Sequence, residues 1–243
     1  LRDGAAADLK RASLNGCSAI RGGALRLVST PQATRGPGRL DSYPIPIAPR
    51  VVLDDSDMSN NTARDVGGVI DAVGTAALPV DVRITNSTMV DSRCPDGVGG
   101  AVAIASGLLS VVRTTIERSR ALQGAAIHLS SVSTTAGVAS TTASVNASVI
   151  REGNATGLST DALSGGGGLF ADGSTSLVID GSTLELNSAD GNGGAMRIEG
   201  ASSAVLRNSV LLRDNTAVYG GGLSAHGASQ IEVYDSELSY NTA

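Results

Sequence analysis

Apolar and polar residues alternate in short runs along this chain, and each run follows a glycine pair or a near copy of one. Seven such units occur, with an apolar residue two and four positions after the second glycine or its substitute. The seven anchor positions are Gly23, Gly68, Gly100, Ala125, Gly167, Gly194 and Gly221. A period of two is typical of a short β-strand with one buried face. Each unit therefore predicts a strand just after its glycine pair.

A second alternating strand leads into a small polar step, as in Leu177-Val178-Ile179 followed by Asp180-Gly181-Ser182. The step column reads Asp55, Asn86, Arg113, Asn146, Gly181, Asn208 and Asp235. Because Asn, Asp and Gly tolerate left-handed backbone, we expect a sharp turn there. Three residues later a third strand is expected at Met58, Met89, Ile116, Val149, Leu184, Leu211 and Leu238. It commonly ends in Asn or Ser, at Asn61, Ser92, Ser119, Asn187, Asn215 and Asn241.

The basic spacing of the units is about 25 to 27 residues, and longer intervals are expected to hold irregular insertions near 30–47 and 130–143. Repeats of this length with β-branched alternation and Gly or Asn turns predict a parallel β-helix rather than a helical solenoid. We expect an all-β chain with three short strands per coil and roughly seven to nine coils. Residues 1–243 are expected to form a single β-helix segment of a longer protein, because the closing Tyr240-Asn241-Thr242-Ala243 repeats Asp214-Asn215-Thr216-Ala217 in mid-unit.

The amino-acid composition limits both the partners and the kind of core that we expect. The formal net charge is -5, and Lys10 is the only lysine among 18 basic residues, so nucleic acid is not an expected partner. No apolar run reaches the roughly 18 to 20 residues needed to span a bilayer. With one Phe, four Tyr and no Trp, the core must be narrow and aliphatic.

The glycine-pair unit is followed by an apolar-x-x-Asn pattern in Met58-Ser-Asn-Asn61, Leu184-Glu-Leu-Asn187, Leu212-Arg-Asp-Asn215 and Leu238-Ser-Tyr-Asn241. This combination resembles the repeat of chlamydial polymorphic outer membrane proteins, and related repeats occur in autotransporter passengers and in surface proteins of algae and protists. The phenylalanine usual in the bacterial pattern is Leu or Met here. The resemblance implies an extracellular, right-handed parallel β-helix with a structural or adhesive role, and it transfers no catalytic residue.

Two cysteines, Cys17 and Cys94, each lie six residues before an anchor and at least two coils apart. Coils stack about 4.8 Å apart, so the two Cα atoms are expected to lie roughly 10 Å or more from one another. A disulfide needs less than about 7 Å, and no Cys17–Cys94 disulfide is expected.

Candidate chemistry is sparse, and no catalytic residue, cofactor or metal is expected. Asp172, Glu199 and His226 stand five residues after successive anchors, where stacked strands would place them within reach of a divalent metal or of acid–base work. A solvated polar column is the alternative interpretation. Asp54, Asp55 and Asp57 resemble a calcium cluster, with turn formation as the alternative. Phe170 is expected to point outward, unless a register shift buries it.

Four Asn-x-Ser/Thr sequons make N-glycans a plausible modification. Asn154, in a stretch expected to be irregular, is the leading candidate, and Asn60 follows. Asn86 and Asn146 fall on the turn column, where an inward-stacked side chain would be unavailable.

Three functional hypotheses remain open. The first is a structural or adhesive rod of a large extracellular or cell-surface protein that packs against other subunits, with an algal wall or a mastigoneme-like ciliary fibre as its setting. The second is a polysaccharide lyase or hydrolase, because such enzymes also use this fold, although fold does not fix function. The third is a glycan- or cation-binding surface without turnover.

Overall fold

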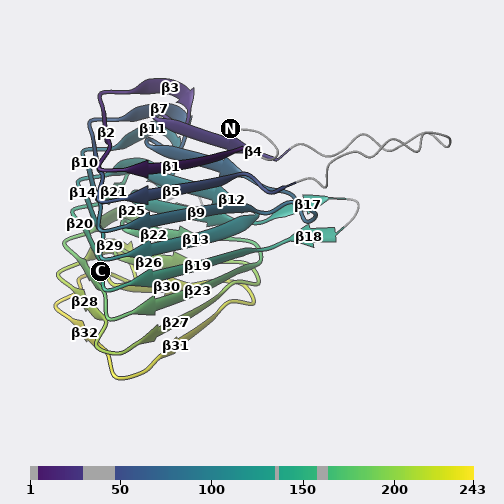
Figure 1. Cartoon of the computed structure of the whole chain (residues 1–243). Helices are drawn as coiled ribbons and strands as arrows, with labels where there is room; N and C mark the ends of the chain where they lie inside the picture. The colour runs from purple at the N-terminus through teal and green to yellow at the C-terminus, as the bar shows by residue number, and fades with distance from the viewer. Residues whose placement is uncertain (1–4, 30–46, 135–136, 158–163) are drawn as a thin grey trace.

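The computed structural model describes residues 5–29, 47–134, 137–157 and 164–243. In these residues the chain forms four parallel sheets that run along one stack of coils, with no helix (Figure 1). The expected all-β, right-handed parallel β-helix is confirmed. Apart from one two-stranded hairpin, the described strands make seven successive sets of four, and two more strands follow.

We name the sheets A to D in chain order. Sheet A contains β1 (Ala6–Lys10), β5 (Arg50–Asp54), β9 (Val80–Thr85), β13 (Gly107–Val112), β19 (Thr141–Asn146), β23 (Thr175–Asp180), β27 (Ser203–Arg207) and β31 (Gln230–Val233). Sheet B contains β2 (Ser13–Asn15), β6 (Asp57–Ser59), β10 (Thr88–Val90), β14 (Thr115–Glu117), β20 (Val149–Arg151), β24 (Thr183–Glu185), β28 (Leu211–Arg213) and β32 (Glu237–Ser239).

Sheet C contains β3 (Ser18–Arg21), β7 (Thr62–Val66), β11 (Arg93–Val98), β15 (Arg120–Gln123), β21 (Asn154–Ala155), β25 (Ser188–Asn192) and β29 (Thr216–Tyr219). Sheet D contains β4 (Leu25–Val28), β8 (Ile70–Val73), β12 (Val102–Ala105), β16 (Ile127–Ser130), β22 (Leu169–Ala171), β26 (Met196–Ile198) and β30 (Leu223–Ala225).

The prediction of three strands per coil is wrong, because sheet C adds a fourth. The hydrophobic pattern does not indicate sheet C, because the inward residues of this sheet are small and give no alternation of large apolar side chains. They are Ala63, Cys94, Ala121, Ala155, Ala189 and Ala217. Its register also shifts within several pairs of strands. The main core instead lies between sheets A, B and D, where aliphatic side chains such as Val82, Met89 and Ile70 are fully buried.

The turn from sheet A to sheet B uses left-handed backbone, as expected, with φ between 45° and 60° at Asp55, Asn86, Arg113, Gly181, Asn208 and Asp235, and Ser209 is a second left-handed residue in its coil. Asn146 is the exception. It ends β19, and Ala147 takes the left-handed conformation with φ 46°. The buried residue that follows is therefore Ile150, not Val149. Likewise the turn at Asn208 has one extra residue, so Leu212 rather than Leu211 faces the core.

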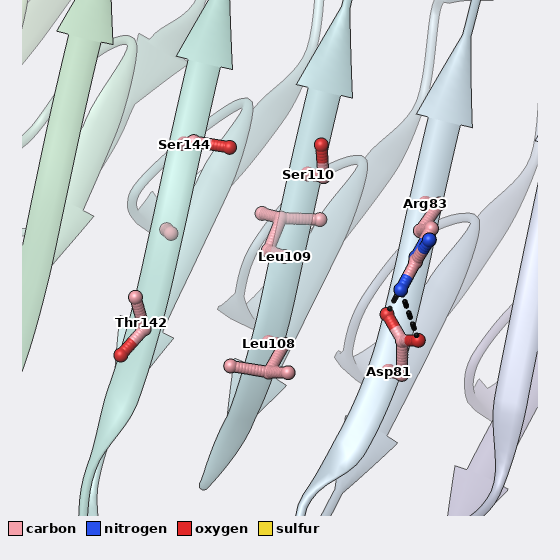
Figure 2. A pocket seen from close by; sticks show the side chains of 8 residues that line it. Asp81, Arg83, Leu108, Leu109, Ser110, Thr142 and Ser144 are labelled. Atoms are coloured by element: carbon pink, nitrogen blue, oxygen red, sulfur yellow. Dashed lines mark hydrogen bonds and ion pairs between the residues drawn. The ribbon is translucent and has the colours of Figure 1, made fainter.

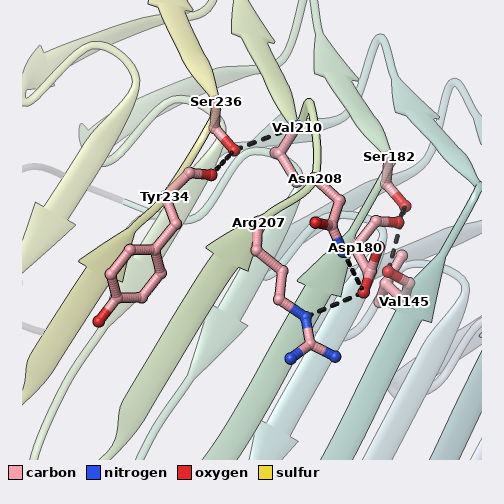
Figure 3. Close-up of polar contacts among 8 residues, drawn as sticks. All are labelled: Val145, Asp180, Ser182, Arg207, Asn208, Val210, Tyr234 and Ser236. Carbon is pink, nitrogen blue, oxygen red and sulfur yellow. Dashed lines mark hydrogen bonds and ion pairs between the residues drawn. The ribbon is translucent and has the colours of Figure 1, made fainter.

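A column of hydroxyl side chains stabilises this turn along the stack. The backbone N–H of Ser56 donates to Ser87 Oγ at 3.1 Å, and the N–H of Ser148 donates to Ser182 Oγ at 3.1 Å. Val210 interrupts the column with an apolar side chain, and its own N–H donates to Ser236 Oγ at 3.2 Å (Figure 3). Each hydroxyl satisfies a buried backbone donor of the preceding coil.

The glycine pairs form the bend from sheet C into sheet D. Gly67 has a φ of +62°, which other residues rarely adopt, and a Cβ on Gly68 would lie 1.9 Å from the carbonyl oxygen of Gly100 in the next coil. Ala125 takes the second glycine position in its own coil, and it packs in a separate apolar cluster with Ala155, Ala189 and Ala217. The pair therefore allows backbone from neighbouring coils to approach closely.

The two expected insertions have different outcomes. The first, near 30–47, lies almost wholly outside the described residues. The second, near 130–143, is not simply irregular, because β17 (Val132–Thr134) and β18 (Gly137–Ala139) form an antiparallel hairpin. Thr141–Ala143 already belong to β19. Figure 1 shows the hairpin extending sideways from the end of sheet A where the strands begin.

Candidate functional site

The outer face of sheet D carries buried side chains, which is unusual for the solvent side of a β-strand. Asp71, His128, Phe170 and Arg197 alternate with core residues yet are exposed by 8% or less. Phe170 keeps its register between His128 and Arg197, so it points away from the main core as expected and is nevertheless buried. Phe170 is therefore neither exposed nor shifted in register, which were the two outcomes that the sequence predicted.

The buried side chains of this face contact one another along the stack. The rings of His128 and Phe170 are nearly parallel, with centroids 5.3 Å apart, and the Arg197 guanidinium lies 5.6 Å from the Phe170 centroid. Burial lowers the pKa of His128 from 6.5 to about 4. At neutral pH His128 is therefore an uncharged ring that packs against its neighbour.

The Arg197 side chain links this buried face to solvent. Its Nη2 atom lies 2.9 Å from Glu199 Oε2, and its Nη1 atom donates to the carbonyl oxygen of Ser164. Glu199 Oε1 lies 3.4 Å from Nδ1 of His226, whose side chain is 69% exposed. The nearly buried Glu199 carboxylate thus lies between the buried Arg197 guanidinium and the exposed His226 imidazole.

The expected column of Asp172, Glu199 and His226 is only partly assembled. The strands that precede the three residues are in register, and the N–H of Glu199 donates to the Ala171 carbonyl at 2.8 Å. In the described residues, however, no contact joins the Asp172 carboxylate to Glu199 or His226, and no group of three His, Cys, Asp or Glu side chains lies close enough to hold a metal ion. His128 lies two coils from the strand of Arg197 and Glu199, but it connects to this cluster through Phe170 and Arg197.

The Asp54, Asp55 and Asp57 carboxylates each contact a different neighbour. Asp54 Oδ1 accepts from Asn86 Nδ2 at 3.1 Å, Asp55 pairs with Arg11 at 3.4 Å, and Asp57 accepts from the Thr88 hydroxyl. Asp55 has the left-handed conformation of the turn. This arrangement follows the turn-forming alternative, because the three side chains do not converge on one point.

Two of the four sequon asparagines are exposed at turns, and the other two are half-buried in strands. Asn60 and Asn86 are exposed at left-handed turns, and Asn86 contacts Asp54 and Arg113 rather than stacking inward. Asn154 begins β21 and is half-buried, so it does not lie in an irregular stretch. Asn146 is also half-buried, at the end of β19. The amides that stack inward belong to another column, which includes Asn187 and Asn215.

Both cysteines are free thiols. They do not share one phase of the coil, because Cys17 donates its N–H to Asn61 Oδ1 and so occupies the asparagine column, whereas Cys94 pairs with Ala121 in sheet C. Burial raises the pKa of the Cys94 thiol to about 12. Cys94 is therefore an inert core residue at neutral pH.

A shallow hollow of about 330 Å³ lies on the outer face of sheet A (Figure 2). Its lining comes from three adjacent strands, namely Asp81 and Arg83, Leu108 to Ser110, and Thr142 to Ser144. Arg83 pairs with Asp81 at 3.1 Å, and Leu108 is 47% exposed. Sequence reasoning missed this hollow, which arises because Ser110 and Ser144 are shorter than the side chains beside them.

The fold and these surfaces define a right-handed parallel β-helix whose polar groups lie mostly in ladders along its axis. No family model, curated protein or solved structure matches the chain. The part of the chain that the structure describes contains no helix long and apolar enough to cross a bilayer.

Proposed function

We propose that this chain is a structural or adhesive segment of a large extracellular or cell-surface protein, in which it serves as a stiff rod that packs against neighbouring subunits. An algal wall or a mastigoneme-like ciliary fibre is the favoured setting. The proposal is supported by the β-helix itself, by the sequons, and by the repeat that resembles those of surface proteins.

The unbroken pairing of parallel strands along all four sheets is the observation that carries this proposal. Every coil is bonded to the next through parallel strands, and the core cluster extends from Leu27 to Leu212 without a break. Hydroxyl and amide ladders add bonds between coils at two bends. Bending the rod would strain bonds in several sheets at once, so such a body transmits force well.

Cross-linking of the native assembly tests this function. Amine-specific reagents would sample only Lys10 among the side chains, so a carboxylate-specific dihydrazide is the better reagent. Exposed carboxylates such as Asp96 and Asp190 are expected to form links to other polypeptides, which mass spectrometry of the digested assembly would identify. Recovery of links within this chain alone, from an intact surface preparation, would contradict the proposal.

A polysaccharide lyase or hydrolase is the second candidate, and the Arg197–Glu199–His226 cluster favours it. Sugar cleavage uses carboxyl groups as acid, base or nucleophile, and Glu199 is the carboxylate with a suitable, nearly enclosed position. Replacing Glu199 with Gln in the full-length protein should abolish polysaccharide turnover if this candidate is right. Unchanged turnover would exclude it, and calorimetric titration with Ca²⁺ or oligosaccharides would test binding without turnover.

A further inference from the structure

On β13, β19, β23 and β27, the outer face of sheet A carries charge only in the register column that holds the Asp180–Arg207 ion pair. On β13, β19, β23 and β27, two register columns point away from buried neighbours such as Leu109 and Ile179. One column holds Leu108, Thr142, Ser176 and Ser203, and the other holds Ser110, Ser144, Val178 and Val205. Leu108, Val178 and Val205 make part of this surface apolar, and exposed apolar patches are typical of interaction sites.

This surface is hollow on one side and raised on the other. The hollow lies over Ser110 and Ser144, whose side chains are short. In the same register column, the next two coils carry the branched side chains of Val178 and Val205. The face therefore carries a depression over β13 and β19 and a ridge of larger side chains over β23 and β27.

The two ends of the same column carry opposite charges. Arg83 precedes Ser110, and with Arg50 and Asp81 it forms a group with a net charge of about +1 at neutral pH. Glu232 follows Val205 in register, and its carboxylate accepts a hydrogen bond from the Tyr234 hydroxyl at 2.8 Å. Both Arg83 and Glu232 are exposed.

We propose that this face binds the same face of a second copy of the chain, about a two-fold axis that runs parallel to the strands between β19 and β23. This operation sets Val178 of each copy over Ser144 of the other and Val205 over Ser110, so the ridge fills the hollow. It also sets Arg83 opposite Glu232, twice per dimer. The two rods lie antiparallel, and each contact occurs in symmetric pairs, as an isologous interface requires.

The size of the face predicts a weak contact. Six strands spaced about 4.8 Å apart, with side-chain columns about 7 Å apart along each strand, give a face of roughly 400 Å² per copy. The total buried area is then about 800 Å², which is below the roughly 1,000 Å² of a stable specific interface and in the range of weak contacts. This inference refines the proposed rod that packs against its neighbours, since weak lateral contacts repeated along a fibre add up.

Sedimentation velocity of the purified chain, from about 10 μM to 1 mM, tests the proposal. We expect a monomer–dimer equilibrium in this range. Arg83→Glu and Glu232→Arg should each raise the dissociation constant about tenfold, because each places two like-charged pairs in the dimer. The double variant should restore it to within about threefold of the original. Arg64→Glu is the matched control, because Arg64 also pairs with a neighbouring Asp but lies in sheet C.

Site-specific cross-linking separates this lateral contact from association at the rod ends. In a Cys17→Ser background, Ser144→Cys lies beside the two-fold axis and should yield a covalent dimer with a thiol reagent of about 8 Å reach, because packed sheets lie about 10 Å apart. Thr115→Cys, on the outer side of sheet B, should not. A chain that stays monomeric at 1 mM, or a dimer insensitive to both charge reversals, would overturn the proposal. A monomer in solution that still cross-links to other polypeptides in the assembly would leave the proposed function intact.

Discussion

The buried asparagine column is the most exacting test of what holds the coils together, and Asn215→Ala is the change to make. Asn215 is fully buried between sheets B and C. Its Oδ1 accepts from the N–H and from Nδ2 of Asn187, both at 3.0 Å. Its Nδ2 donates to the Leu184 carbonyl at 3.0 Å and to Asn241 Oδ1 at 2.9 Å.

Alanine removes all four side-chain hydrogen bonds and leaves the Asn187 N–H without its acceptor inside the stack. A typical bond contributes about 1 kcal/mol, and a buried orphaned donor adds about 1 to 3 kcal/mol, so we expect a loss of about 4 kcal/mol in the free energy of unfolding. Ser119→Ala is the control. Ser119 is equally buried in the same column, but its hydroxyl has no hydrogen-bond partner within the described structure, so its removal should cost less than about 1 kcal/mol.

Urea unfolding followed by far-UV circular dichroism measures both variants. Native-state hydrogen exchange at the Asn187 amide adds a local reading, because stacked repeats need not unfold in one step. Asn215→Ala should accelerate that exchange at least a hundredfold. If the two variants differ by less than 1 kcal/mol and the Asn187 amide stays protected, the asparagine column does not stabilise the stack as we argue.

Three further predictions follow from single residues. Gly68→Ala should destabilise the chain by about 3 kcal/mol or more, because the new Cβ would meet the backbone of the next coil. Gly181→Ala should cost only about 1 kcal/mol, because its φ is +51° and the atom nearest to the new Cβ is 3.5 Å away. Equal losses of unfolding free energy in urea would refute this difference. His128 has a folded-state pKa of about 4 against 6.5 when unfolded, so the unfolded state binds more protons between those values and stability should fall by roughly 3 kcal/mol as pH drops from about 6.5 to 4. His128→Phe should remove that slope, and an unchanged pH profile would show that His128 does not cause it. Iodoacetamide at pH 8 should label Cys17 before Cys94 in the folded protein, because Cys94 is buried and the pKa of its thiol is about 12. In urea the reagent should label both cysteines. Equal labelling of the two cysteines in the folded protein, measured by mass spectrometry, would contradict the burial of Cys94.

Only part of the candidate site can be predicted from the sequence. The register of Asp172, Glu199 and His226 follows from the repeat, because a parallel stack aligns equivalent positions. The sequence did not reveal that Arg197 lies between this column and Phe170, because that contact depends on how the outer face of sheet D is covered. Nor did the sequence show that Cys17 and Cys94 lie two residues apart in the register of sheet C, because that irregular register differs from coil to coil.

The sequence by itself determined the parallel β-helix, the inward columns of sheets A, B and D, and the glycine and left-handed positions at the bends. These follow from local periodicity and backbone sterics, which each unit repeats. Only the tertiary structure decided that a fourth sheet exists, that Ala147 rather than Asn146 takes the left-handed turn conformation, and that the outward residues from Asp71 to Arg197 on sheet D are buried. Small side chains and single-residue shifts barely change a hydrophobic pattern, yet they change which atoms meet when the coils stack.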